Sequence, residues 1–185
     1  MTCIDEIERA GYVASIYHDE DAESPASWCN VGTLAYDTRS ASCGDMPSYW
    51  RDYGLESLIP ADATLCLPVY AYDDRNGTVL HVSDWERANG WIYATDACAC
   101  GCGSKHGMDS VQLRAALESK LNVWQQWAQG DVYGVVVKSP SNEEVDACWG
   151  FYGLEYAEEE AARMLDIEEV HMLERHPNLA KMVIS

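Results

Sequence analysis

The sequence has few basic residues, a single phenylalanine and no long apolar run. Twelve lysines and arginines stand against 31 aspartates and glutamates, so the formal net charge is −19. A chain this acidic repels nucleic acid and anionic membranes, and it is attracted to basic surfaces. No run approaches the roughly 18 apolar residues of a membrane span. The first residues, MTCIDEIERAGY, lack the basic and apolar regions of a signal peptide, which predicts a cytoplasmic protein.

Motifs of common catalytic sites are also missing from the sequence. The patterns GxSxG, GxxxxGK[ST] and GxGxxG do not occur. His18, His81 and His106 are far apart in the sequence, and none has a nucleophile motif nearby. We therefore predict that the protein is not an enzyme.

Hydrophobic residues make up 48% of the 185 residues, which is enough for a buried core. This length predicts a single domain over residues 1–185. Within it we expect an irregular but ordered, aromatic-rich insertion at residues 28–63 and an acidic C-terminal helix at residues 156–185.

The order of predicted elements indicates the α+β class. Apolar residues recur at helical spacing over Ser110–Gln129, with a capping box at Asp109 and Gln112 and a stop at Gly130. A second helix is predicted at residues 157–175. Strands are predicted at residues 11–18, 64–72, 78–83, 90–95, 131–139 and 146–153. We expect a mostly antiparallel sheet, with the two helices packed on one face.

Acidity is concentrated at both ends of the sequence. The net charge is −9 over residues 1–62, −2 over residues 63–142 and −8 over residues 143–185. Surface carboxylates also keep proteins soluble, and glutamates in the first turn of a helix stabilise its positive end. The candidate partner-binding residues are Asp19, Glu20, Asp21, Glu23, Glu158, Glu159, Glu160, Glu168 and Glu169.

The segment DACACGCGSKH places Cys98, Cys100 and Cys102 at alternate positions before His106. Thiolates and an imidazole suit Zn²⁺, but structural zinc usually takes wider Cys-x₂₋₄-Cys spacing. We interpret the segment as a glycine-rich turn and predict no cofactor; zinc binding and thiol redox chemistry are the alternatives. Without a signal peptide, the eight cysteines are expected to be thiols.

Two further patterns have a functional and a structural interpretation. Acidic residues around a predicted hairpin, Asp73, Asp74, Asp84 and Glu86, are either ligands of a divalent cation or solvated turn residues. Several aromatic residues are either the lining of a ligand pocket or parts of the core. They are Trp28, Trp50, Tyr70, Tyr72, Trp85 and Trp91.

Several segments resemble a family of small, uncharacterised proteins encoded by bacteriophages and prophages. The segments are SPASWCNVGTL (24–34), PVYAYD (68–73), GWIY (90–93), GDVYGVV (130–136) and CWGFYG (148–153). They follow one another in a consistent order over most of the chain. The cysteine segment is not part of this pattern. The resemblance implies phage origin and carries no activity.

A small acidic phage-type protein without catalytic motifs suits a stoichiometric inhibitor of host defence. DNA carries a phosphate charge about every 1.7 Å, and a carboxylate surface can occupy the same basic groove. The expected partner is the basic surface of a host nuclease or surveillance complex, as for an anti-CRISPR or antirestriction protein. The alternatives are a metal-dependent module at the cysteine segment and an accessory protein that binds a small ligand or a host factor. The sequence does not indicate an oligomeric state.

Overall fold

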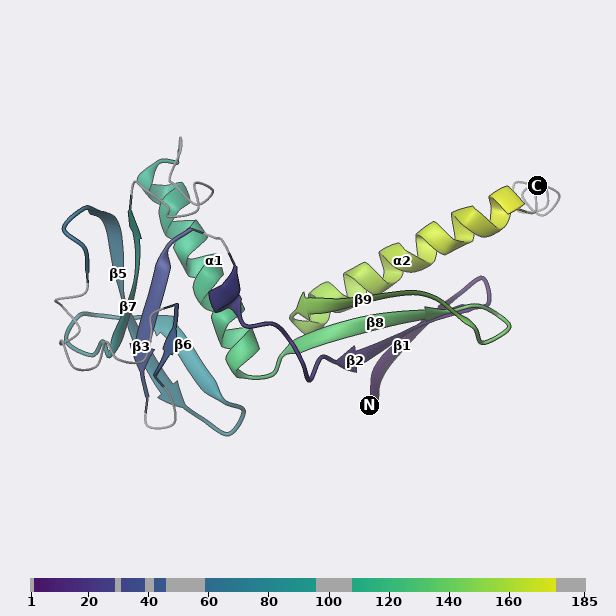
Figure 1. Cartoon of the computed structure of the whole chain (residues 1–185), viewed down its shortest axis with the longest axis horizontal. Helices are drawn as coiled ribbons and strands as arrows, with labels where there is room; N and C mark the ends of the chain where they lie inside the picture. Colours follow the sequence, from purple (N-terminus) through teal and green to yellow (C-terminus); the bar gives the residue numbers. More distant parts are fainter. Residues whose placement is uncertain (1, 29–30, 39–41, 46–58, 96–107, 176–185) are drawn as a thin grey trace. The chain divides into compact units, whose positions relative to one another are not determined.

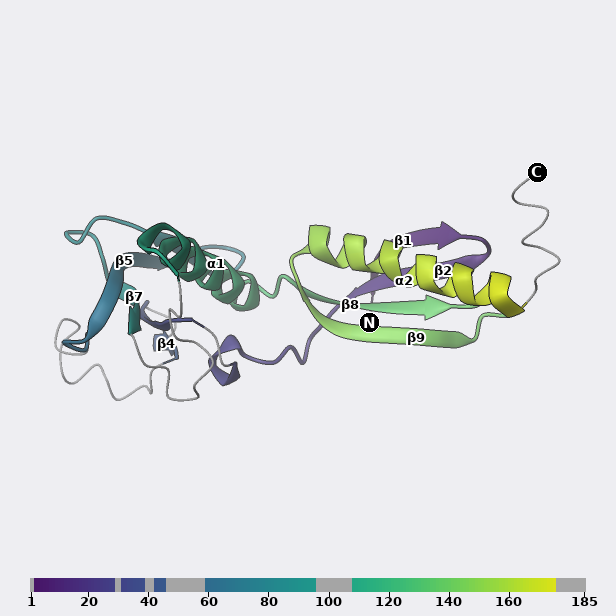
Figure 2. The same ribbon diagram turned by 90° about the horizontal axis from the view of Figure 1, so that it is seen from above.

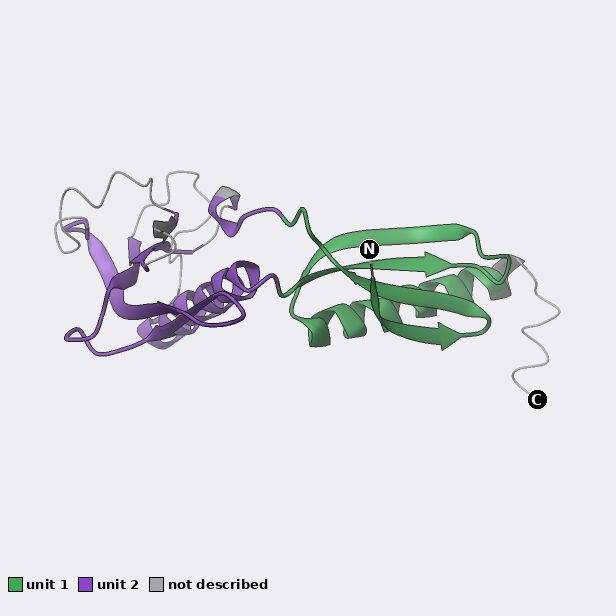
Figure 3. Ribbon diagram, turned by 90° about the horizontal axis from the view of Figure 1, so that it is seen from below, with its two compact units in different colours: residues 1–22, 131–185 green, residues 23–130 purple. Residues whose placement is uncertain are grey.

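The computed structural model describes residues 2–28, 31–38, 42–45, 59–95 and 108–175. The chain forms two compact units, each with its own core (Figures 1 and 3). Unit 1 comprises residues 1–22 and 131–185, and unit 2 comprises residues 23–130. The expectation of a single domain over residues 1–185 stays a prediction.

Unit 1 is a four-stranded antiparallel sheet with one helix on it. Its strands lie in the order β1 (Cys3–Arg9), β2 (Tyr12–His18), β8 (Val132–Lys138) and β9 (Glu144–Tyr152). The helix α2 (Leu154–Arg175) runs along one face of this sheet (Figure 2). The predicted C-terminal helix is therefore present as far as Arg175, and residues 176–185 lie outside the described part.

Small and apolar side chains join α2 to its sheet. Ala157 and Ala161 are fully buried four residues apart, and Leu165 follows after four more. This spacing keeps one helical face toward the sheet, and the alanines let the backbones approach closely. From the sheet, alternate residues of β2 and β8, such as Ile16 and Val135, complete the core.

The junction of β8 and β9 explains two of the aromatic–glycine segments. Gly134 pairs with Trp149, and a Cβ on Gly134 would lie 1.9 Å from Cε3 of the indole ring. The ring therefore lies over the glycine. Gly150 has φ +85° at a β-bulge that places Phe151 in the core and leaves Trp149 40% exposed. The segment CWGFYG thus places the ring of Phe151 in the core and the ring of Trp149 on the opposite face of the sheet.

Unit 2 is a five-stranded antiparallel sheet in the order β4-β3-β7-β5-β6. Its elements are the 3₁₀-helix η1 (Pro25–Ser27), β3 (Thr33–Asp37), β4 (Ser42–Gly44), β5 (Ala63–Asp73), β6 (Thr78–Val82), β7 (Gly90–Thr95) and α1 (Ser110–Ala128). The predicted irregular insertion at residues 28–63 therefore contains two strands, β3 and β4. Residues 46–58 of it lie outside the described part.

The helix α1 begins and ends as the sequence predicts. Asp109 accepts hydrogen bonds from the N–H groups of Val111 and Gln112 at 2.8 and 2.9 Å, and the Gln112 side chain accepts from Asp109 N–H. Gly130 follows with φ +69°. Leu113, Leu117, Leu121 and Trp124 are buried against the sheet.

One charged residue of α1 is also buried. Lys120 is 6% exposed, donates to the carbonyl of Gly32 at 2.6 Å, and forms an ion pair with Asp45. Asp45 in turn accepts from Leu34 N–H at 2.7 Å. This pair fastens α1 to the segment that follows β4.

The α+β class with antiparallel sheets is confirmed in the described part of the chain. The helices do not share one sheet, because each packs on the sheet of its own unit. Among the described residues, neither helix is long and apolar enough to cross a membrane.

Candidate functional site

The acidic residues are concentrated in unit 1. Its sequence has 18 acidic and 5 basic residues, a net charge of −13, whereas the longer unit 2 has 13 and 7, a net charge of −6. The pairing of β2 with β8 brings the two ends of the sequence into one unit. Two acidic stretches that are far apart in the sequence therefore contribute to the same surface.

Two backbone hydrogen bonds bring the predicted clusters to one end of unit 1. Asp19 N–H donates to the carbonyl of Val132 at 2.8 Å, and Gly153 N–H donates to the carbonyl of Asp131 at 2.9 Å. The segment after β2 and the start of α2 thus flank the start of β8 (Figure 3). We call this surface the acidic end: Asp19, Glu20, Asp21, Asp131, Glu155, Glu158 and Glu159.

Side chains at the acidic end differ in exposure. Glu20, Asp21 and Glu159 are exposed, whereas Asp19 and Glu158 are half-buried. Sequence reasoning missed Asp131 and Glu155. The sequence did hold a signal for both. Asp131 begins the predicted strand at residues 131–139, and Glu155 closely follows Gly153, the glycine that ends the CWGFYG segment.

The remaining predicted acidic residues lie elsewhere. Glu160 is paired with Arg163, whose Nε donates to it at 2.8 Å; this carboxylate raises the pKa of the guanidinium. Glu169 lies half-buried farther along α2, and Glu23 belongs to unit 2. Glu168 is only 8% exposed, faces the sheet and lies 3.4 Å from Nδ1 of His171, so it is not part of the accessible acidic surface.

Tyr133 contacts two residues at the acidic end, His18 and Asp131. Its ring stacks on His18 with a centroid distance of 4.9 Å. Burial raises its pKa to about 12, and the hydrogen bond to Asp131 and the charge of that carboxylate act in the same direction. The phenol therefore remains neutral at physiological pH and donates to the carboxylate.

The face of the unit 1 sheet opposite α2 is partly apolar. Tyr17, Gly134 and Trp149 form one row across β2, β8 and β9, and Ser15, Val136 and Ala147 form the next. Trp149 is 40% exposed in this row. An exposed indole on such a face has the chemistry of an interface anchor.

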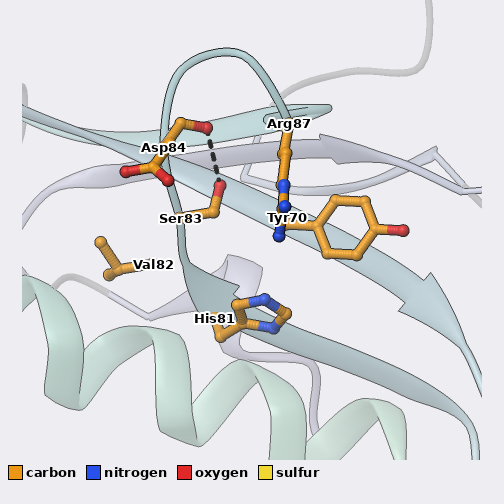
Figure 4. A pocket seen from close by; sticks show the side chains of 6 residues that line it. All are labelled: Tyr70, His81, Val82, Ser83, Asp84 and Arg87. Carbon is orange, nitrogen blue, oxygen red and sulfur yellow. Dashed lines mark hydrogen bonds between the residues drawn. The ribbon is translucent and has the colours of Figure 1, made fainter.

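Unit 2 carries a different surface on the face of its sheet away from α1. Tyr70, Tyr72 and His81 lie together there, with ring centroids 5.4 to 6.0 Å apart. A hollow of about 560 Å³ lies beside Tyr70 and is lined also by Val82, Ser83, Asp84 and Arg87 (Figure 4). We call it the Arg87 hollow. Arg87 extends toward Tyr70 in this view.

Only part of the predicted aromatic set gathers at this surface. Trp91 is 2% exposed and belongs to the core of the sheet, whereas Trp85 is 55% exposed in the turn after β6. Trp28 follows η1 and is 37% exposed. Trp50 lies outside the described residues. The shared signal of the two tyrosines is their i, i+2 spacing on one strand.

The predicted zinc residues Cys98, Cys100, Cys102 and His106 lie outside the described residues. Elsewhere in the described chain, no three His, Cys, Asp or Glu side chains converge on a metal site. Two of the four hairpin acids make contacts within the hairpin: Asp74 accepts from Asn76 N–H at 2.7 Å, and Asp73 accepts from the Thr78 hydroxyl at 3.1 Å.

Cys3, Cys66 and Cys148 are free thiols. Burial raises the pKa of Cys66 to about 11. The pKa of Cys3 is also raised, by burial and then by the charge of Glu6.

Comparisons with protein-family models, curated proteins and solved structures found no match to this chain.

Proposed function

We propose that this chain is an interaction protein whose unit 1 binds the basic, nucleic-acid-binding surface of another protein. The observation that carries the proposal is the concentration of charge: unit 1 has a net charge of −13 and unit 2 only −6. Acidity needed only for solubility would not have to be concentrated in one unit. A partner that binds phosphates would be attracted to this surface.

The partner class follows from the same chemistry. A nuclease or a surveillance complex holds nucleic acid in a groove of lysine and arginine side chains, and the carboxylates of the acidic end compete for those side chains. The resemblance to phage-encoded proteins makes a host defence complex the natural target. The protein then acts stoichiometrically, as an anti-CRISPR or antirestriction inhibitor, without catalysis.

Binding in this proposal uses two parts of unit 1, the acidic end and Trp149. Long-range attraction by the acidic end raises the association rate and depends on salt. Trp149, on the open face of the same sheet, offers an apolar anchor that is insensitive to salt. Mimicry by charge alone would use only the first contact.

A matched pair of variants tests the proposal. The variant Asp21→Asn/Glu158→Gln/Glu159→Gln removes three charges from the acidic end. The control Asp62→Asn/Glu86→Gln/Glu118→Gln removes three exposed charges from unit 2. Each tagged protein is used to capture partners from nuclease-treated lysates of bacteria that carry CRISPR and restriction systems, at low and at high salt.

We expect the parent and the control to retain a nucleic-acid-binding subunit at low salt and to lose most of it at high salt. The affinity of the acidic-end variant for that purified subunit should fall about tenfold. Equal losses in both variants would mean that only total charge matters. Capture by both variants as strong as by the parent would contradict the proposal.

A further inference from the structure

The edges of the two sheets differ in how far the chain itself covers them. The edge strands are β1 and β9 in unit 1 and β4 and β6 in unit 2. In unit 2, β4 is three residues long, and Gln125 of α1 covers β6 by accepting from Leu80 N–H at 2.9 Å. In unit 1, β1 begins with a bulge, and the Asp5 carboxylate accepts from Glu6 N–H at 2.8 Å. Short strands, bulges and covering side chains are ways in which proteins protect a sheet edge from pairing with another chain.

The strand β9 leaves a short stretch of its edge uncovered in the described part of the chain. It lies at the outer edge of the unit 1 sheet (Figure 2), and its residues from Glu144 to Gly150 are all exposed. Between two bulges, the stretch Asp146–Trp149 pairs with β8 in unbroken register. Among the described residues, the one hydrogen bond of this stretch outside that pairing runs from the Cys148 thiol to the Trp149 carbonyl, at the long distance of 4.0 Å. Because alternate residues of an antiparallel strand direct their N–H and C=O groups away from the partner strand, this stretch presents backbone donors and acceptors to solvent.

The two faces of this stretch have different chemistry. Asp146 pairs with the core residue Val137 and therefore projects toward the α2 side of the sheet. Ala147 and Trp149 lie on the opposite, open face, where Trp149 is 40% exposed. An added strand therefore has an acidic neighbour on one face and apolar neighbours on the other. A strand that alternates basic and apolar residues matches both faces.

The charge along this edge favours a basic strand over an acidic one. Residues 131–153, which contain β8 and β9, have four acidic residues and one basic residue, Lys138. Lys138 lies opposite the first residue of β9, beyond a bulge, and Arg163 of α2 is already paired with Glu160. Asp146 forms no ion pair or hydrogen bond with its side chain in the described part of the chain. A second copy of this acidic chain is therefore disfavoured at the edge, whereas a lysine or arginine opposite Asp146 is favoured.

We propose that the β9 edge binds an extended, basic segment of a partner protein, which adds to the unit 1 sheet as a fifth strand. Main-chain hydrogen bonds to Asp146–Trp149 supply affinity, as in other cases of strand addition. A basic side chain opposite Asp146 and apolar side chains against Trp149 select the segment. The inference rests on the proposed function only in taking the partner to be basic, and the β9 edge shares no residue with the acidic end.

The test uses the full chain and the hexapeptide acetyl-(Lys-Val)₃-amide. An acidic counterpart with glutamate in place of lysine tests the role of charge. Two N-methylated forms of the basic peptide, one methylated at its odd and one at its even positions, keep the side chains and the charge, but each removes the N–H donors of one edge. Calorimetry measures affinity, and hydrogen exchange followed by NMR shows which amides of β9 become protected.

Two site variants are matched with one control. The site variants are Asp146→Lys, which reverses the charge at the edge, and Trp149→Thr, which removes the apolar ring and keeps a residue suited to strands. The control is Glu8→Lys, which makes the same change of charge at an exposed position of β1, the opposite edge strand of the same sheet. Circular dichroism checks that each variant is folded. The N-methylated peptides are used with the parent chain, so that part of the test does not depend on the folding of a variant.

We expect the basic peptide to bind and to protect alternate amides within Asp146–Trp149, and the acidic peptide not to bind. At least one N-methylated form should lose binding. Each site variant should weaken binding of the basic peptide about tenfold, and Glu8→Lys only about twofold. No binding of the basic peptide, equal binding of the acidic peptide, full binding of both N-methylated forms, or affinity unchanged by both folded site variants would overturn the proposal.

The peptide test and the lysate capture can fail independently. The three-charge variant of the acidic end keeps the β9 edge intact and should retain most of the peptide binding. Loss of lysate capture with peptide binding retained would count against the role of the acidic end alone. Loss of peptide binding with lysate capture retained would count against the β9 edge alone.

Discussion

The two units use charge in opposite ways. Among the side chains that the structure describes, each helix buries one charged residue, Lys120 in α1 and Glu168 in α2. Lys120 is neutralised by Asp45, whereas Glu168 meets His171, whose charge depends on pH. Most other acids of unit 1 lie at its surface or edge, and few bases accompany them.

The two units therefore differ in how far charged and polar side chains contribute to the fold itself. In unit 2, ion pairs and the amide of Asn89 fix where strands and helix meet. In unit 1, alanines, valines and leucines do most of this, together with an exposed ion pair between Arg9 of β1 and Asp166 of α2. Unit 2 suits a site of defined geometry, and unit 1 suits long-range attraction.

The largest expected effect comes from breaking the buried pair of unit 2. Lys120→Met should lower the free energy of unfolding by about 3–5 kcal/mol, because Asp45 is left without its cation in a mostly buried position. Urea unfolding measured by tryptophan fluorescence tests this. The control is Arg114→Met on the same helix, whose pair with Glu118 is exposed and should be worth about 0.5 kcal/mol. Similar losses in both variants would show that the buried pair has no special role.

A smaller effect is expected from the apolar packing of unit 1. Gly134→Ala should cost about 1–3 kcal/mol, because the new Cβ would meet the Trp149 ring at 1.9 Å. Hydrogen exchange should show the loss in β8 and not in β7. Adding Trp149→Ala should recover part of the stability. If the two changes only added their losses, the ring would not be the cause.

The smallest effect concerns Tyr133 in unit 1 and Cys66 in unit 2, whose titration changes stability only at alkaline pH. The folded state raises the pKa of Tyr133 from 10.0 to about 12 and that of Cys66 from 9.0 to about 11. Each contribution to stability is complete below the unfolded pKa and is lost as pH rises through the folded pKa. The loss of stability that comes from Cys66 in unit 2 should therefore begin at lower alkaline pH than the loss that comes from Tyr133 in unit 1.

Hydrogen exchange at increasing alkaline pH measures this order in the parent chain. Cys66→Ala should remove the earlier loss in unit 2, and Tyr133→Phe should remove the later loss in unit 1. Simultaneous losses that neither variant alters would show that other groups control alkaline unfolding.

Local sequence signals predicted most of the elements but not their division between sheets. The capping box at Asp109 and the β-branched run of β8 depend on residues close in sequence, so their patterns were sufficient. The strand β1, CIDEIER, was missed because it is an edge strand in which only Ile7 packs against the core. The pairing of β2 with β8 joins distant segments and has no local signal.

The candidate sites depend on the same long-range pairings. Asp21 and Glu158 were both recognised as acidic, but only the sheet of unit 1 shows that their segments meet. Tyr70 and Tyr72 were identified as candidates, but Asp37 lies with them at one hollow only because Asn89 joins the end of β3 to β5. The candidate residues could thus be identified one by one from the sequence, whereas which of them lie close together in the fold could not.

The insertion of unit 2 between β2 and β8 has a consequence for synthesis on the ribosome. The β1–β2 hairpin emerges first, and an isolated hairpin is at best marginally stable. Its partner strand β8 emerges only after all of unit 2, which can fold in the meantime and shorten the effective loop between them. The acidic end is therefore among the last surfaces to form, and a nascent chain that stops before α2 would lack Glu155, Glu158 and Glu159 of it.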